Sequence, residues 1–255
     1  MVVVNHRKNL PDNSIMNQNI PFFADLSTYT PQKTMNFYKN VFGWNYYQQD
    51  NYFTAFINEK EITGLYETPQ KFKQINMPSF WMTYIKVSNV RKTVAKATQL
   101  GAIIEATDKI PDTDKFALIR DPQGAGFTIY EGTGIQNTRT QNTKNTLIWN
   151  ELHVADVTRI IPFYQGIFNW KIQKVNDGFY TIFTKDGQIS VADILEIPNQ
   201  LKGKFEYWVC TFGVDNLQKA QKRILQEGGS VINTETHRLL CADNSHEAFF
   251  YIQEV

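Results

Sequence analysis

FYKNVFGW, residues 37–44, occurs again as FYQGIFNW, residues 163–170, a shift of 126 positions. Further along each copy, Trp81 recurs as Trp208 and Gly101 as Gly228, both at a shift of 127 positions. Self-similarity at a nearly constant distance is the mark of a repeated structural unit, here one that occupies about half of the chain. The sequence therefore predicts two domains of the same fold in tandem.

The boundary between the two copies is marked by composition. The segment GTGIQNTRTQNTKN, residues 132–145, is polar and lacks hydrophobic periodicity, which is typical of a linker. We therefore predict a first domain over 21–131 and a second over 146–255. The N-terminal extension, 1–20, is polar and precedes the first repeat. We expect its first fifteen residues to pack poorly on the domains.

A shorter repeat divides each domain into two modules. Four starting positions are each followed by an apolar residue three positions further on and by a valine or threonine five positions further on; they are Phe23, Met82, Trp149 and Val209. The seventh place always holds a residue that caps helix N-termini: Thr30, Asn89, Asp156 and Asn216. The nineteenth or twentieth place holds a residue that ends helices in the left-handed conformation: Gly43, Gly101, Asn169 and Gly228. Strand-like runs such as YFTAFI and KFALIR follow each helix. Each module is therefore predicted to be βαβββ, and the fold class α+β.

Two prolines affect the predicted helices in opposite ways. Pro31 falls at the first helical position after Thr30, where its missing N–H removes no hydrogen bond. Pro162 falls inside the helix predicted after Asp156, where it removes a backbone hydrogen bond and clashes with the preceding turn. We expect the third helix to be kinked or partly opened at Pro162.

Composition excludes several classes of partner. The 26 basic and 25 acidic residues give a net charge of +1, and no basic stripe stands out, so neither nucleic acid nor a membrane surface is an expected partner. The apolar runs are far too short to span a bilayer, and the VVV run at residues 2–4 is too short for the apolar core of a secretory signal, so we expect none. Two cysteines are too few for a disulfide framework. We expect a soluble, cytoplasmic protein that is a monomer or a homodimer.

The modules resemble those of a known superfamily. WNELHVAD (149–156), followed by Phe163 and Tyr164, is similar to the His-x-x-Leu-x-Val-x-Asp pattern and Phe-Tyr helix of the glyoxalase/bleomycin-resistance/dioxygenase superfamily, also called vicinal-oxygen-chelate proteins, except that Trp149 replaces the histidine. FADLSTYT (23–30) matches more loosely, and DPQGAGFTIYE (121–131) resembles a turn and last strand of such a domain. The resemblance implies four βαβββ modules paired into two half-barrel domains of the glyoxalase/bleomycin-resistance type.

The resemblance also implies where a metal would bind. In the metal enzymes of the superfamily, the concave face of each half-barrel carries histidine and glutamate ligands. The matching positions hold Phe23, Met82 and Thr128 in the first half, and Trp149, Val209 and Phe250 in the second. The remaining ligand position lies near 63–65 in the first half and 192–194 in the second. None of the six residues is a usual ligand for zinc, iron, nickel or manganese. We therefore expect no metal and no cofactor.

Strand alternation identifies polar residues on the same face as Trp149. Side chains two and four residues further on point the same way, which places Glu151 and His153 beside it. An acid next to a histidine can orient it as a general base or bind a polar group of a ligand. The alternative is a solvated or self-satisfied polar pair without a function.

The first half offers a weaker set of candidates. Asp25 and Ser27 take the matching places, and Tyr84 and Tyr130 are expected to face the same cleft. An aromatic ring there can stack on a planar ligand, but it can equally be a packing residue. Cys210 is expected to face a helix and to be a small buried residue rather than a nucleophile.

Three functions remain open on the sequence alone. The first is a metal-independent protein that binds a small, partly aromatic molecule, supported by apolar residues at the former ligand positions. The second is a glyoxalase- or dioxygenase-like enzyme that uses a displaced metal or acid–base chemistry by Glu151 and His153. The third is a structural or interaction protein whose clefts are filled by its own aromatic side chains.

Overall fold

The computed structural model describes residues 18–110 and 114–255, so the expectation for residues 1–15 lies outside the described residues. The first module consists of β1 (Pro21–Thr28), α1 (Pro31–Phe42), β2 (Asn45–Gln49), β3 (Tyr52–Ile57) and β4 (Lys60–Glu67). The second consists of β5 (Phe80–Lys86), α3 (Val90–Gln99), β6 (Ile103–Ile110), β7 (Asp114–Arg120) and β8 (Gly126–Glu131). The third consists of β9 (Leu147–Val154), η1 (Val157–Arg159), α4 (Ile161–Phe168), β10 (Lys171–Asn176), β11 (Phe179–Phe183) and β12 (Ser190–Glu196). The fourth consists of β13 (Tyr207–Val214), α6 (Leu217–Gln226), β14 (Ser230–Thr234), β15 (Arg238–Ala242) and β16 (Phe249–Glu254).

Two further short helices connect modules and were not foreseen. Helix α2 (Gln70–Lys73) lies between β4 and β5, and helix α5 (Asn199–Lys202) lies between β12 and β13. Within the described residues, no helix has both the length and the apolar character needed to cross a membrane.

The strands form two eight-stranded mixed sheets. Their orders are β2-β3-β4-β1-β5-β8-β7-β6 and β10-β11-β12-β9-β13-β16-β15-β14. The first strand of a module pairs in parallel with its last strand, as β1 does with β4 and β13 with β16, and the other strand pairs within each module are antiparallel. Each sheet is built from two consecutive modules, which confirms the predicted fold class and the pairing of βαβββ units.

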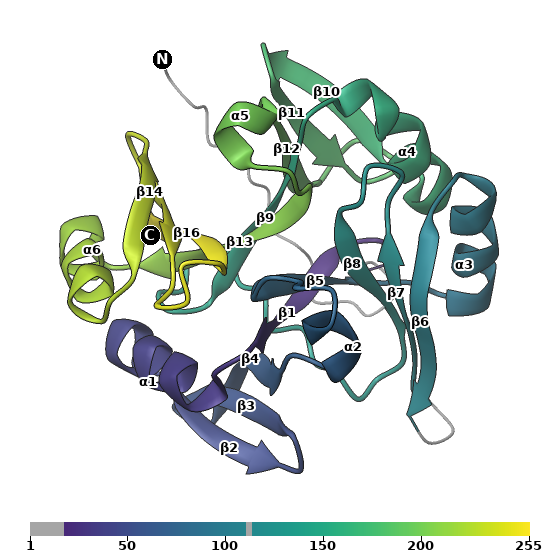
Figure 1. Ribbon diagram of the computed structural model, residues 1–255. Helices are drawn as coiled ribbons and strands as arrows, with labels where there is room; N and C mark the ends of the chain where they lie inside the picture. Colours follow the sequence, from purple (N-terminus) through teal and green to yellow (C-terminus); the bar gives the residue numbers. More distant parts are fainter. Residues whose placement is uncertain (1–17, 111–113) are drawn as a thin grey trace. The chain divides into compact units, whose positions relative to one another are not determined.

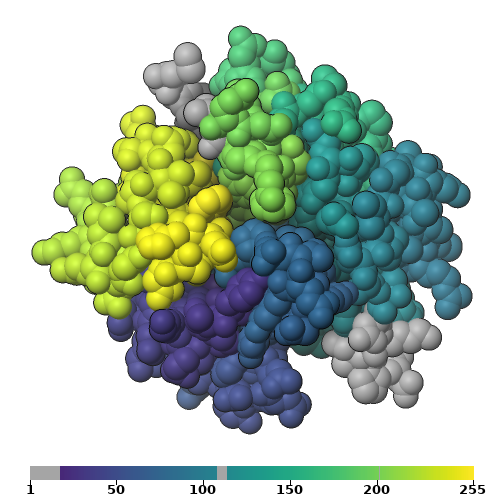
Figure 2. All heavy atoms as spheres, viewed as in Figure 1, coloured from purple at the N-terminus to yellow at the C-terminus, as the bar shows by residue number. Residues whose placement is uncertain are grey.

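Side-chain packing groups the modules differently from the sheets. Unit 1 combines the described residues up to Phe22 with Tyr84–Ile135 and Asn150–Trp208. Unit 2 combines Phe23–Thr83, Gln136–Trp149 and Val209–Val255. Each unit has a hydrophobic core of its own. Helices α3 and α4 lie side by side in unit 1, and α1 and α6 do so in unit 2 (Figure 1). In Figure 2 the surface of α1, in purple, adjoins the yellow C-terminal module of the same unit.

The repeated Phe-Tyr and Trp residues are explained by the cores. In unit 1 the Tyr164 hydroxyl donates to Asp121 Oδ2 at 3.0 Å and accepts from Trp208 Nε1 at 3.2 Å. In unit 2 Tyr38 donates to Asp243 Oδ2 at 3.4 Å and accepts from Trp81 Nε1 at 3.1 Å. Burying each aromatic side chain contributes about 1.5–3 kcal/mol, but only if its polar atom keeps a hydrogen bond. The same buried Tyr–Asp–Trp hydrogen-bond network is therefore present in both units.

The predicted helix ends are mostly confirmed. Asn89, Asp156 and Asn216 each accept a hydrogen bond from a backbone N–H of the first turn. Thr30 is the exception: it is the N-cap of α1, but its side chain makes no capping hydrogen bond. At the other ends, Gly43 and Asn169 adopt the left-handed conformation with φ of 77° and 56°.

The third helix is interrupted near Pro162, as predicted. The helical segment after Asp156 is divided into the short 3₁₀ helix η1 and helix α4, which begins at Ile161. Pro162 thus falls in the first turn of α4, where no intrahelical N–H partner is lost.

The segment 132–145 contains no helix or strand, but part of it is buried. Thr138 and Arg139 are only 6% and 8% exposed. The Asp114 carboxylate accepts from the N–H groups of Thr133 and Gly134, which attaches the start of this segment to β7.

Candidate functional site

The two faces of each strand have different surroundings. In β9, Leu152 and Val154 belong to the core of unit 1, so Glu151 and His153 point to the opposite face of the sheet. The same rule applies to β13, where Trp208 lies in the core and Tyr207 faces the other way. Alternation therefore places Glu151, His153 and Tyr207 on one face of unit 1.

These three side chains form a hydrogen-bonded chain. His153 Nε2 lies 2.7 Å from Glu151 Oε1, and both side chains are fully buried. His153 Nδ1 lies 3.4 Å from the Tyr207 hydroxyl, and the two rings are 5.2 Å apart. An ionised Glu151 can only accept a hydrogen bond, so a neutral imidazole donates to it from Nε2 and accepts a hydrogen bond from the Tyr207 hydroxyl at Nδ1. We call these residues the Tyr207–His153–Glu151 relay.

Tyr207 is the outermost member of the relay. It is half-buried, whereas His153 and Glu151 are not exposed at all. Burial and the nearby charges of Glu151 and Glu206 raise the pKa of Tyr207 to about 12, so the hydroxyl keeps its proton. Sequence reasoning missed this residue, although it stands two positions before Val209 and so shares its face.

A second carboxylate lies beside the relay. Asp193 is the register partner of Glu151 in the parallel pairing of β12 with β9, and Thr181 Oγ1 donates to Asp193 Oδ1 at 2.9 Å. The register partner of His153 is Leu195, which is apolar. Asp193 falls within residues 192–194, where the family resemblance placed the remaining ligand position. The strand register shows that it stands next to Glu151.

Asp25 occupies the matching place in unit 2, with different neighbours. The Tyr52 hydroxyl donates to Asp25 Oδ2 at 3.2 Å, and the Tyr52 ring is stacked on Tyr66 with centroids 6.3 Å apart. Gly64 is the register partner of Asp25, and a Cβ atom at Gly64 would collide with the Tyr52 hydroxyl. The glycine thus lets Tyr52 cover the carboxylate, and Asp25 is only 1% exposed.

Trp149 is separated from the relay by its packing. Although it lies on β9, it belongs to unit 2, and the Arg139 guanidinium stands 4.4 Å from its ring. Arg139 Nε also donates to the backbone oxygen of Ile148 at 3.4 Å. A buried residue of the segment 132–145 therefore covers the face of Trp149.

The two tyrosines predicted in the first half have separate environments in unit 1. Tyr130 donates to Asp114, accepts from the N–H of Ile135 at 2.9 Å and is fully buried. Its hydroxyl is thus used to attach the segment that follows β8. Tyr84 is half-buried on β5, with Thr128 as its register partner on β8.

The family metal positions do not fit a metal, and one of them was assigned wrongly. Phe250 packs in the core of unit 2 against Phe37, Tyr38 and Phe212, not on the face opposite the helices. The preceding turn is one residue longer than in the first half, and a slip of one residue moves a strand side chain to the other face. Tyr251, the register partner of Thr211, is therefore the residue of β16 that lies on the face opposite the helices.

Tyr251 is itself engaged with protein groups. Its hydroxyl lies 3.3 Å from Glu235 Oε1, and the Arg238 guanidinium stands 4.0 Å from its ring. Among residues 18–110 and 114–255, no three histidine, cysteine, aspartate or glutamate side chains are grouped to hold a metal ion. The donor set therefore fits no metal at the family positions.

Comparison with known proteins gives a family match over most of the chain. The model of the Glyoxalase/Bleomycin resistance protein/Dioxygenase superfamily matches residues 22–129 and 146–240. Among curated proteins, the chain is similar to "Putative glyoxylase CFP32" of Mycobacterium tuberculosis, with 26% identity over 234 residues and 88% of each chain covered. It is also similar to the anthracycline biosynthesis protein DauV of Streptomyces sp. strain C5, with 21% identity and 92% and 93% coverage.

Solved structures share the fold. The 2,3-dioxygenase LapB from Pseudomonas sp. KL28 superposes with a TM-score of 0.63 at 11% identity, covering 94% of this chain and 93% of that one. Homoprotocatechuate 2,3-dioxygenase from Brevibacterium fuscum gives a TM-score of 0.61 at 13% identity, covering 96% of this chain and 74% of that one. At such identities the likeness concerns the fold and not the reaction.

Proposed function

Because this chain belongs to the glyoxalase/bleomycin resistance protein/dioxygenase superfamily, we propose that it binds a small, partly aromatic molecule at the Tyr207–His153–Glu151 relay without a metal ion. The observation that carries the proposal is the fully buried His153–Glu151 pair, joined at 2.7 Å and hydrogen-bonded to Tyr207, a residue that is half-buried. A buried ionisable pair is costly to maintain and is rarely needed to stabilise a core, so a ligand-binding role explains its presence.

The relay favours a particular ligand group. A Tyr207 hydroxyl that donates to His153 Nδ1 can also accept a hydrogen bond at its oxygen. A weakly acidic hydroxyl, such as a phenol, donates such a bond, and its ring matches the partly aromatic class. The neighbouring charges of Glu151 and Asp193 disfavour a carboxylate or phosphate at the same point.

Asp25 and Trp149 are not part of the proposed site. In unit 2 the Tyr52 side chain covers Asp25, and Arg139 covers Trp149. These contacts favour a structural role for both residues, as in the filled-cleft alternative. We therefore assign ligand binding to unit 1 alone.

A second candidate function is acid–base catalysis by the same relay. The linear order of hydroxyl, imidazole and carboxylate would let a ligand proton move to His153 through Tyr207 while Glu151 stabilises the imidazolium. Turnover of a bound phenol or enol, measured by mass spectrometry over hours, distinguishes catalysis from binding alone.

The test is a thermal-shift screen of phenols, aromatic aldehydes and aromatic acids in the presence of a chelator. We expect phenols to raise the melting temperature, and Tyr207→Phe to weaken their binding roughly tenfold, the equivalent of one hydrogen bond of about 1.4 kcal/mol. Phenylalanine stands at the matching position of the first half, Phe80, so this variant is compatible with the fold.

The matched control is Asp25→Asn in unit 2, which should leave the affinity for phenols unchanged. Glu151→Gln should weaken it. Equal affinity in the wild type, Tyr207→Phe and Glu151→Gln would overturn the proposal, as would binding that disappears when metal ions are chelated.

A further inference from the structure

Lys202 is a buried lysine in the segment that leads into Tyr207. Its side chain is 0% exposed, and its Nζ lies 3.0 Å from Glu206 Oε1. The same ammonium donates to Asn199 Oδ1 at 2.8 Å and to the backbone oxygen of Phe205 at 3.0 Å. A charge is buried at an acceptable cost only when its donors are satisfied, and here the acceptors all come from the segment that contains the lysine.

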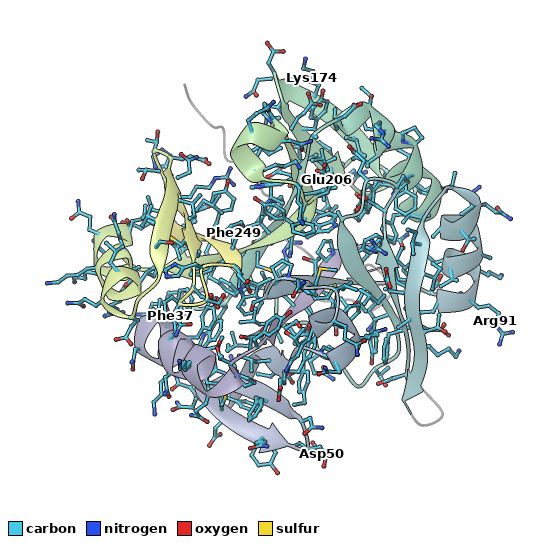
Figure 3. The ribbon with its side chains drawn as sticks, in the orientation of Figure 1. Phe37, Asp50, Arg91, Lys174, Glu206 and Phe249 are labelled. Atoms are coloured by element: carbon cyan, nitrogen blue, oxygen red, sulfur yellow. The ribbon has the colours of Figure 1, made fainter. Side chains whose placement is uncertain are left out.

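Glu206 carries this connection to the strand of the relay. Its second oxygen, Oε2, accepts a hydrogen bond from the N–H of Ala155 at 2.9 Å. Ala155 stands two residues after His153, and Glu206 immediately precedes Tyr207. The bond therefore joins the two chain segments next to the point where Tyr207 meets His153. Figure 3 labels Glu206 in the segment that links α5 to β13.

The first half of the chain provides an internal comparison. Residues that match His153, Glu206 and Tyr207 by strand register and by the repeated tryptophan are Ser27, Ser79 and Phe80. The lysine that ends α2, Lys73, pairs with Glu67, and these side chains are 24% and 59% exposed. The fold therefore does not require a buried lysine here. The buried lysine and its glutamate occur in the half that has the tyrosine and the histidine.

We propose that Lys202 is a positioning residue of the relay: through Glu206 it holds the segment Asn199–Glu206 against the end of β9 and thereby keeps the Tyr207 hydroxyl on His153 Nδ1. The inference deepens the proposed function, since the residue it positions is the one assigned to the ligand. Without the ammonium, the carboxylate of Glu206, whose side chain is 8% exposed, is left buried with the N–H of Ala155 but without a countercharge, and it moves toward solvent. Tyr207 follows it because the two residues are adjacent.

The test uses the full chain with ¹⁵N-labelled histidine, and the signals of His153 are assigned with a His153→Gln variant. The chemical shift of Nδ1 reports whether that nitrogen accepts a hydrogen bond. The Tyr207→Phe variant gives the reference value of the Nδ1 shift when no hydroxyl donates to that nitrogen. We expect Lys202→Met to move the shift more than half of the way to this value, Lys202→Arg to move it less, and the matched variant Lys73→Met to leave it at the wild-type value.

A role limited to stability gives a different pattern. If Lys202→Met lowers the melting temperature but keeps the wild-type Nδ1 shift, the inference is overturned. If Lys202→Met does not fold, Glu206→Gln replaces it, because glutamine still accepts from Ala155 but no longer binds an ammonium strongly; an unchanged Nδ1 shift in that variant also overturns the inference. No ligand enters this experiment, so its failure is distinct from a failure to bind phenols.

Discussion

At the residue scale, Asp121 makes the stability of unit 1 depend on pH. Its Oδ1 accepts from the N–H groups of Gln123, Gly124 and Ala125, yet burial raises its pKa to about 6. A folded pKa above the unfolded value of 3.8 means that its stabilising contribution is full below pH 3.8 and is lost as pH rises through 6. The difference in unfolding free energy between Asp121→Asn and the wild type should therefore grow in favour of the variant, by on the order of 2–3 kcal/mol, as the pH rises from 4 to 7. Urea unfolding at several pH values measures this difference. Asp186→Asn, at an exposed acid whose pKa is lowered, should show no such rise over the same range. A flat difference for Asp121→Asn would contradict the argument.

At the element scale, the helix caps differ in what they contribute. Asn216 Oδ1 accepts from the N–H of Lys219 at 2.8 Å at the start of α6, whereas Thr30 makes no side-chain capping bond at the start of α1. Asn216→Ala should reduce the free energy of unfolding by about 1 kcal/mol, and Thr30→Ala should cost clearly less. Chemical denaturation of both variants against the wild type provides the measurement. Equal losses of unfolding free energy in the two variants would show that the side-chain hydrogen bond of Asn216 does not account for its stabilising effect.

At the scale of the whole molecule, each core is shared between the two halves of the sequence. The core of unit 1 joins Ile85–Ile129 of the second module to Leu152–Trp208, and that of unit 2 joins Ala24–Trp81 to Leu147 and Cys210–Ile252. In a fragment of residues 146–255, the core side chains of the third and fourth modules would lose their partners from the first half of the chain and be exposed to water. We expect it to unfold without cooperativity when expressed alone, and to recover a cooperative transition when it is co-expressed with residues 1–145. Calorimetry and sedimentation of the separate and combined fragments test this; a monomeric fragment with a sharp transition would refute it.

Local patterns in the sequence determined the modules and the faces on which most of the candidate side chains lie. Period-two alternation put Glu151 and His153 on one face, and capping residues placed the helix starts, because both effects act within a few residues. The Pro162 break and the burial of Cys210 followed from the same local rules. The family resemblance assigned Phe250 to the concave face because the turn before it was counted as one residue shorter than it is, and the side chain lies on the other face.

Tertiary structure alone decided which modules share a core and what surrounds each candidate residue. Tyr207 and Asp193 come to Glu151 and His153 from 40 or more residues away in the chain, through a hydrogen bond and through strand register, and Lys202 is linked to the end of the same strand through Glu206. Likewise, the covering of Asp25 by Tyr52 depends on the absence of a side chain at Gly64 in another strand. A sequence determines alternation and capping because they are local, but partners brought together by register and packing depend on the free energy of the whole fold.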